Sequence, residues 1–251
     1  MIVLKTSAEL DVMDRANALV HDTLRVVANA ARVGVTTLEL DAIAEEHIRA
    51  RGGRPAFKGY RGYPANLCTS VNDVIVHGIP SQGCRLKEGD ILSIDCGTVV
   101  DGYVGDAAVT IPIGTAAPEA ARLMRVTFEC LQAAVGQVRV GQRVSDVGST
   151  VQKHAEAHGY SVVRDLCGHG VGRAMHEDPQ VPNYGLPGRG PELRPGLVLA
   201  IEPMVNAGKP GVVFDPDGWT ARTEDGKLSA HFEYSVAVTE NGPWVLGMAR
   251  E

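Results

Sequence analysis

Two aspartates stand on the two arms of a predicted β-hairpin, where their spacing suits a shared ligand. Runs rich in β-branched residues flank the Asp101-Gly102 pair, which is typical of a two-residue turn. This register places Gly97 opposite Asp106, and Asp95 lies two residues along the same arm, on the same face as Gly97. Burying both carboxylates is costly unless a cation lies between them. The alternative is that one of them is a solvated turn or edge carboxylate.

A second candidate cluster spans residues 167–179 and holds His169 and His176 in a predicted glycine-rich turn. Small residues permit close approach of the backbone to a ligand. The two histidines could therefore serve catalysis or metal ligation, or be ordinary structural groups. Phosphate binding is disfavoured, since residues 168–172 lack both the Lys-Ser/Thr ending of a P-loop and the dinucleotide-binding spacing.

Two glutamates and one more histidine occupy predicted strand positions. Glu202 follows a buried-type apolar run and precedes a proline, where it could be a metal ligand, a general base or a salt-bridge partner. Glu233 lies inside a predicted strand, where a glutamate is disfavoured and needs a partner, either an arginine or a metal. His77 ends another apolar run, and a strand-edge histidine without a role is the simpler interpretation.

The combined inventory is four carboxylates and one or two histidines, with no cysteine partner. Such an oxygen-rich set suits two divalent ions bridged by carboxylates, as in hydrolytic two-metal sites. The cysteines are scattered without a C-x-x-C pair, which predicts free thiols in a reducing compartment. They are Cys68, Cys84, Cys96, Cys130 and Cys167.

Paired helices alternate with strands along the chain. Capping-box patterns open two helices, Thr6 with Glu9 and Thr36 with Glu39, and Pro118 opens a third. These helices are predicted to end near glycines 34, 52 and 136, and a fourth covers about 145–158. Strands are predicted at 91–100, 103–111, 197–201, 212–214 and 232–239.

A faint internal repeat relates the two halves. Residues 32–34, Arg-Val-Gly, recur at 139–141, an offset of 107 (139 minus 32), and His47 then matches His154. Two copies favour a pseudo-twofold domain, with chance matching as the alternative. Helix pairs with antiparallel strands predict an α+β fold, with helices on one sheet face and the other face free for a site. No linker divides the chain, so residues 1–251 are predicted to form one domain.

Composition excludes several classes of protein. The chain is 44% hydrophobic and 22% charged, which is ordinary for a globular domain. No apolar run approaches the roughly 18 residues of a membrane helix, and the N-terminus lacks a secretory pattern. A cytoplasmic location without membrane attachment is expected. The net charge of −6 disfavours specific nucleic-acid binding.

The ordered set of motifs resembles the type I methionine aminopeptidases, from the first helix to about Gly242. The motifs are Val76-His77-Gly78-Ile79-Pro80, Asp95 with Asp106, Gly168-His169-Gly170-Val171-Gly172, Met175-His176-Glu177, Ile201-Glu202-Pro203-Met204, and Glu233. The resemblance implies the pita-bread fold, a pseudo-twofold antiparallel sheet with helix pairs on one face and a dinuclear metal site on the other. It also implies a single catalytic aminopeptidase domain.

The resemblance implies a metal role for five residues. Asp106 and Glu233 would bridge two divalent ions, His169 and Glu202 would complete the first site, and Asp95 would complete the second. Glu202 would also act as general base with the bridging water or hydroxide. Cobalt, manganese, iron and zinc all suit this ligand set.

The same resemblance implies substrate contacts. His176 would contact the substrate carbonyl and stabilise the tetrahedral intermediate, and His77 would contact the nitrogen of the scissile peptide. Apolar, sulfur-tolerant side chains would form the methionine pocket: Phe57, Tyr60, Tyr63, Cys68 and Trp219. A structural monovalent cation would be held by Asn72, Val74 and Ser229.

Two pocket residues depart from the family pattern. Met175 stands where many members carry phenylalanine, and Phe57 replaces a residue that is often smaller, so both are expected to reshape the pocket wall. The histidines predicted on helices are interpreted as surface groups that the chemistry does not need. They are His21, His47, His154 and His158.

The implied activity is removal of the initiator methionine from nascent proteins with a small second residue, by a monomer that is compatible with a ribosome contact. One alternative is a proline-directed aminopeptidase or dipeptidase of the same fold, although such relatives usually carry an additional N-terminal domain. Another is a non-catalytic binding protein. Such relatives typically lose metal ligands, whereas all five are present in this sequence.

Overall fold

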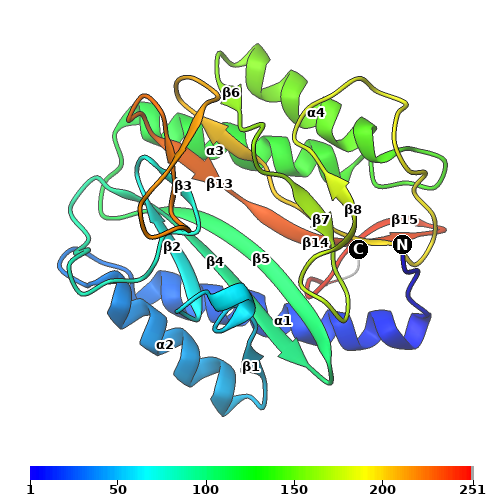
Figure 1. The fold of residues 1–251 in the computed structure, drawn as a ribbon, viewed down its shortest axis with the longest axis horizontal. Helices are drawn as coiled ribbons and strands as arrows, with labels where there is room; N and C mark the ends of the chain where they lie inside the picture. The colour runs from blue at the N-terminus through cyan, green and yellow to red at the C-terminus, as the bar shows by residue number, and fades with distance from the viewer. Residues whose placement is uncertain (250–251) are drawn as a thin grey trace.

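The computed structural model describes residues 1–249, in which four helices pack against a curled antiparallel sheet (Figure 1). Helices α1 and α2 form one pair, and α3 and α4 form the other. α1 packs along the long strands β4 and β5, whereas α3 contacts β5, β9, β13 and β14. The helices are α1 (Ser7–Ala30), α2 (Thr37–Ala50), α3 (Pro118–Val135) and α4 (Val144–Ala157).

The main sheet follows the order β1-β4-β5-β14-β9-β7-β8, with β2 also paired to β4 and β15 to β14, and every pair is antiparallel. Its strands are β1 (Arg54–Pro55), β2 (Leu67–Val71), β4 (Ile91–Val100), β5 (Tyr103–Pro112), β7 (Gly168–Gly170), β8 (Glu177–Val181), β9 (Val198–Ile201), β14 (Glu233–Thr239) and β15 (Gly242–Val245).

Two small sheets complete the fold, in the orders β13-β10-β6 and β11-β12-β3. Their strands are β3 (Val74–Val76), β6 (Ser161–Val162), β10 (Met204–Asn206), β11 (Val212–Phe214), β12 (Ala221–Thr223) and β13 (Ser229–His231). A single 3₁₀ turn covers Tyr60–Gly62. None of the helices among residues 1–249 has the length and apolar character needed to cross a membrane.

The helix starts confirm the capping signals in the sequence. The Thr6 side chain accepts from the backbone N–H of Glu9, and the Glu9 carboxylate accepts in return from the Thr6 N–H. Thr36 and Glu39 form the same reciprocal pair at α2. Each pair satisfies backbone donors that a helix start would otherwise leave open. Pro118 occupies the first turn of α3, where its missing N–H costs nothing.

The two halves of the fold follow the sequence repeat. Helices α2 and α4 have 14 residues each, and their starts at 37 and 144 differ by the same 107 positions. An isolated antiparallel bridge joins Thr36 to Arg85, and its counterpart at the same offset joins Arg143 to Glu192. The glycines that end the repeated Arg-Val-Gly motif have φ angles of 90° and 87°. The pseudo-twofold arrangement is therefore confirmed in the backbone.

The hairpin of β4 and β5 has the predicted register. Val100 pairs with Tyr103, and Gly97 pairs with Asp106. Both turn residues have positive φ, 47° and 79°, as a two-residue hairpin turn of type I′ requires. The backbone therefore places Asp95 and Asp106 on the same face of the sheet, as the spacing predicts.

The glycine-rich segment differs from the prediction. His169 lies in strand β7, between β8 and β9, and not in a turn. The flanking glycines allow close approach of neighbouring strands: a Cβ at Gly168 would lie 2.3 Å from the Ala200 carbonyl oxygen, and one at Gly170 would lie 2.2 Å from that of Asp178. The glycines thus serve strand packing at this point, because backbone atoms fill the space that a side chain would need.

We predict that Gly105→Ala destabilises the protein. A Cβ at this position of β5 would lie 2.6 Å from the Ala16 carbonyl carbon in α1, so the helix has to move away from the sheet. Such overpacking costs about 1–3 kcal/mol, measured by chemical denaturation. Gly83→Ala is the matched control, because its Cβ would meet its nearest neighbour at 3.6 Å. Equal stability of the two variants would contradict this packing.

Candidate active site

Every side chain that the sequence analysis places in the main site lines one cavity of about 160 Å³. Arg61 and Met175 line it as well. The side chains from the sequence analysis are Phe57, Tyr60, Tyr63, Cys68, His77, Asp95, Asp106, His169, His176, Glu202, Trp219 and Glu233. The structure therefore brings together residues that lie up to 176 positions apart in the chain (233 minus 57).

Neighbouring strands of the main sheet supply the five predicted metal ligands. β4 carries Asp95, β5 carries Asp106, β7 carries His169 and β14 begins at Glu233, while Glu202 directly follows β9. Since β5, β14, β9 and β7 are consecutive in the sheet, side chains on the same face converge. Glu233 pairs with Ala108 of β5, and this pairing sets the register of β14 against β5.

The carboxylates of this cluster are buried without matching cations. Asp106 is 3% exposed and Glu233 is 2% exposed. Burial, together with the charges of the neighbouring carboxylates, raises the pKa of Asp106, Glu202 and Glu233 well above their usual range. Burial also raises the pKa of Asp95. Among residues 1–249, the ion-pair contacts to this cluster come from two histidines, His169 and His231.

Buried oxygen atoms face this space without a hydrogen-bond partner among the described residues: Asp95 Oδ1, Asp106 Oδ1 and Glu233 Oε1. A buried carboxylate oxygen with no donor is costly unless a cation satisfies it. One ligand atom each from Asp106, His169 and Glu233 lie within 4.8 Å of one another. The donor set therefore fits hard divalent cations.

His169 has the protonation state and tautomer of a metal ligand. Burial and the nearby His176 lower its pKa to about 4, so the ring is neutral near pH 7. Its Nδ1 lies 2.9 Å from the Gly170 carbonyl oxygen, which can only accept, so Nδ1 carries the proton. The Nε2 lone pair then faces Asp106 Oδ2 at 3.8 Å and Glu202 Oε1 at 3.7 Å. This is the usual arrangement of a histidine ligand with a backbone acceptor behind it.

His231 is a member of the cluster that the sequence analysis missed. This residue is 1% exposed, and its Nε2 lies 3.7 Å from Glu202 Oε2. Burial and the nearby His77 lower its pKa to about 3. His231 precedes Glu233 by two residues, so strand alternation would place both side chains on one face, but the predicted strand, 232–239, begins one residue after His231.

His176 and Tyr60 form a pair at the cavity wall. The Tyr60 hydroxyl lies 2.8 Å from His176 Nδ1, and the two rings stack with centroids 5.3 Å apart. Burial, with a smaller effect of Arg61, lowers the pKa of His176. In the tautomer in which the Tyr60 hydroxyl donates to Nδ1, the His176 ring carries its proton on Nε2. His176 is thus prepared to donate a hydrogen bond.

His77 lies just after β3 with a φ of 60°, a left-handed conformation that costs about 1–3 kcal/mol for a residue other than glycine. Burial and the nearby His176 lower its pKa to about 4. Its ring meets Trp219 edge-on, with centroids 6.4 Å apart, and Trp219 in turn meets Tyr63 at 5.1 Å. These aromatic contacts hold the strained histidine at the rim of the cavity.

Phe57 and Met175 cover strand β4 at Gly97. A Cβ at Gly97 would lie 2.6 Å from the Phe57 ring and 3.0 Å from the terminal carbon of Met175. The two residues predicted to depart from the family pattern therefore lie at the same point of the pocket wall.

The residues of the predicted monovalent-cation site lie side by side. The Ser229 N–H donates to the Asn72 carbonyl oxygen at 2.9 Å, and Val74 begins the adjacent strand β3. The side chain of Asn72 is also engaged, since its Oδ1 accepts from the Ile91 N–H at 3.0 Å. The structure brings these residues together, and a cation there stays a prediction.

Comparison with known proteins defines the class of this site. The family model of metallopeptidase family M24 matches residues 11–240. A relative from Clostridium perfringens, named methionine aminopeptidase, is 49% identical to this chain. The alignment covers 100% of both chains. The chain belongs to metallopeptidase family M24.

Solved structures agree with this assignment. The methionine aminopeptidase of Thermotoga maritima superposes with a TM-score of 0.97 at 45% identity, over 99% of this chain and 100% of that one. The prolidase of Pyrococcus horikoshii superposes with a TM-score of 0.80 at 22% identity, over 100% of this chain and 65% of that one. The second likeness shows the fold alone, and both confirm the pita-bread fold.

We predict that Asp106→Asn stabilises the protein once metal has been removed. The substitution takes one charge out of a group of buried carboxylates that repel one another. Burial and this repulsion both raise the pKa of Asp106, and each unit of the shift corresponds to about 1.4 kcal/mol. The Tm of the variant in a chelator is therefore expected to exceed that of the wild type. Adding manganese is expected to raise the Tm of the wild type and to leave that of the variant nearly unchanged.

The matched control is Glu240→Gln, which removes a carboxylate from an exposed position. It is expected to leave both the chelated Tm and the manganese response as in the wild type. A chelated Asp106→Asn protein that melts below the chelated wild type would show that the charges of this cluster do not repel as described.

Proposed function

We propose that this chain is a methionine aminopeptidase that removes the N-terminal methionine from peptides and nascent proteins with a small second residue. The observation that carries this proposal is the union, in one cavity, of an acidic cluster that fits cations and a wall of apolar and aromatic side chains. The cluster suits hydrolysis, and the wall suits an unbranched thioether. Two relatives named methionine aminopeptidase, which align with 98% and 100% of this chain, support it.

Two divalent ions are the proposed cofactors, with cobalt, manganese, iron and zinc all compatible with the donors. Asp106 and Glu233 would hold both ions, His169 and Glu202 would complete one site, and Asp95 would complete the other. When bound, such ions lower the pKa of water and polarise a carbonyl oxygen.

Glu202 is the proposed general base. Its carboxylate lies between His169 and His231, at 3.7 Å from a ring nitrogen of each. Burial raises its pKa well above the usual range of a glutamate, so it holds a proton more readily than an exposed glutamate does. We propose that Glu202 accepts a proton from the attacking water and passes it on to the departing amine.

The two other histidines are proposed to contact the peptide. His176 would donate from Nε2 to the carbonyl oxygen as negative charge develops there, with Tyr60 holding the required tautomer at 2.8 Å. His77, which also lines the cavity, would contact the nitrogen of the scissile bond. Its strained backbone and its aromatic neighbour Trp219 keep it in place.

Further features of the whole chain belong to the same proposal. We infer that residues 1–251 act as one catalytic domain, as a monomer in the cytoplasm, on nascent chains near the ribosome. A monovalent cation beside Asn72, Val74 and Ser229 would support strand β3, which leads to His77. The contact between Ser229 and Asn72 supports this placement.

The proposal is tested by peptide hydrolysis after metal removal and restoration of manganese or cobalt. Met-Ala-Ser is expected to be cleaved only with metal, whereas Leu-Ala-Ser and Ala-Pro-Ala are expected to stay intact. Cleavage of Ala-Pro-Ala would move the protein to the proline-directed enzymes that share the fold. A protein that binds metal and cleaves none of the three would instead be a binding protein.

Substitutions separate substrate contacts from metal ligands. His77→Ala is expected to lower kcat/KM for Met-Ala-Ser by on the order of 10²-fold, the effect of losing one hydrogen bond to the reacting group. Its metal content is expected to stay close to that of the wild type. Glu233→Ala is expected to lose metal and activity together. Parallel loss of metal and activity in His77→Ala would contradict the proposed role of His77.

A further inference from the structure

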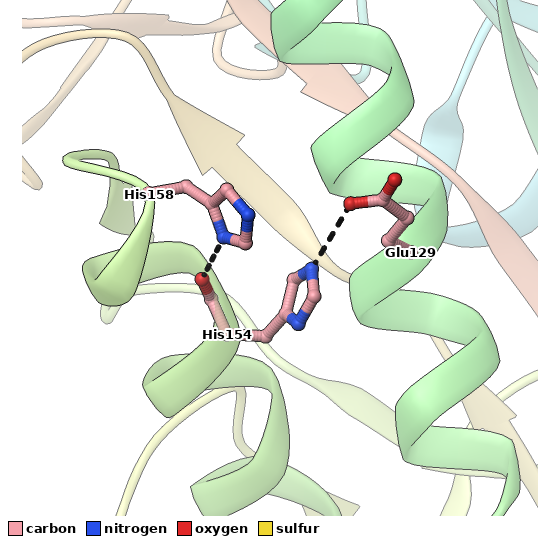
Figure 2. Close-up of side chains that lie close together, drawn as sticks. All are labelled: Glu129, His154 and His158. Carbon is pink, nitrogen blue, oxygen red and sulfur yellow. Dashed lines mark hydrogen bonds and ion pairs between the residues drawn. The ribbon is translucent and has the colours of Figure 1, made fainter.

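A second cluster of potential metal ligands lies between α3 and the end of α4, and its members are not among the residues that line the cavity. Glu129 projects from α3, His154 projects from the last turn of α4, and His158 caps the end of α4 (Figure 2). All three residues are partly exposed. One ligand atom of each lies within 4.8 Å of those of the other two.

The geometry of Glu129 and His154 suits one shared ion. Glu129 Oε2 and His154 Nε2 are 3.2 Å apart. Two ligand atoms on one tetrahedral zinc ion, with bonds of about 2.0–2.2 Å, are separated by about 3.3–3.5 Å. An ion can therefore take the place of the hydrogen bond between them with little movement of either side chain.

His158 is prepared to be the third ligand. Its Nδ1 lies 2.8 Å from the His154 carbonyl oxygen, which can only accept, so Nδ1 carries the proton. This leaves the Nε2 lone pair for a metal, with a backbone acceptor fixing the tautomer. The rings of His154 and His158 are also close, with centroids 4.6 Å apart.

Glu129 is ionised in this setting. A hydrogen bond from Arg125, followed by one from His154, lowers the pKa of the Glu129 carboxyl. Arg125 binds the other oxygen, Oε1, at 2.7 Å, and so leaves Oε2 directed toward His154. A carboxylate and two imidazoles form a borderline ligand set that suits zinc and its neighbours among the divalent metals.

The internal repeat supplies a comparison within the same molecule. At the offset of 107, Glu129 and His154 correspond to Asp22 and His47, which are also paired, with Asp22 Oδ2 2.9 Å from His47 Nε2. The counterpart of His158 is Arg51, which caps α2 as His158 caps α4.

In the first half the arginine supplies the cation. Arg51 Nε lies 3.0 Å from Asp22 Oδ2, and its Nη1 lies 3.1 Å from His47 Nδ1, so the guanidinium bridges the carboxylate and the imidazole. In the second half, His158 replaces the guanidinium with a metal-ligating group. The carboxylate–histidine pair therefore contacts a guanidinium in the first half and a third potential metal ligand in the second half.

We propose that Glu129, His154 and His158 form a zinc-type site for a divalent transition metal, separate from the ions of the active site. Three protein ligands with water in the fourth position would complete a tetrahedral ion. The ion would link α3 to the end of α4, in the way that Arg51 links α2 to α1.

The test is a titration of the chelator-treated protein with zinc, by calorimetry, in the wild type and in His158→Arg. This variant copies the arrangement of the first half, so it is expected to fold and to keep its manganese-dependent aminopeptidase activity. The wild type is expected to bind one more equivalent of zinc than the variant. Glu129→Gln, which keeps the size of the side chain, is expected to weaken the same equivalent at least tenfold.

Equal numbers of zinc equivalents in the wild type, His158→Arg and Glu129→Gln would overturn the proposal. NMR spectra locate the bound zinc. The ring signals of His154 and His158 are expected to shift when the additional equivalent of zinc binds. If that equivalent is bound while both sets of signals stay unchanged, the zinc lies elsewhere and the proposal is wrong.

Discussion

The mutual repulsion of four buried carboxylates is the constraint on which the rest of the structure depends. Asp95, Asp106, Glu202 and Glu233 face one cavity, and the described residues offer them only neutral histidines as ion-pair partners. A chain that folds with these groups together needs protons or cations from outside to balance them. Membership of a metallopeptidase family agrees with this requirement, and the proposed hydrolytic chemistry uses the same ions.

The pseudo-twofold fold explains how so many charged groups reach one place. Each half contributes a helix pair that covers one side of the sheet, and each contributes strands that end at the cavity (Figure 1). The repeat offset of 107 also relates Asp95 to Glu202, so one carboxylate from each half comes from an equivalent position. The two halves have diverged elsewhere, because the first carries the guanidinium of Arg51 where the second carries His158.

Much of this arrangement follows from the sequence because it depends on local rules. Capping boxes fix the starts of two helices, and the turn chemistry at 101–102 fixes the register that places Asp95 beside Asp106. Other features depend on contacts between distant segments. His169 lies in a strand and not in a turn because neighbouring backbones fill the space beside its glycines, and the burial of His231 arises only when the strands assemble.

The most direct test of the central claim is anomalous diffraction from crystals grown with manganese. Two strong peaks are expected in the cavity, the first within bonding distance of His169 and Glu202 and the second beside Asp95. Both peaks are expected to be shared by Asp106 and Glu233. A well-ordered cavity without a peak, with all four carboxylates in the positions described, would show that the protein balances these charges by another means and would contradict the account.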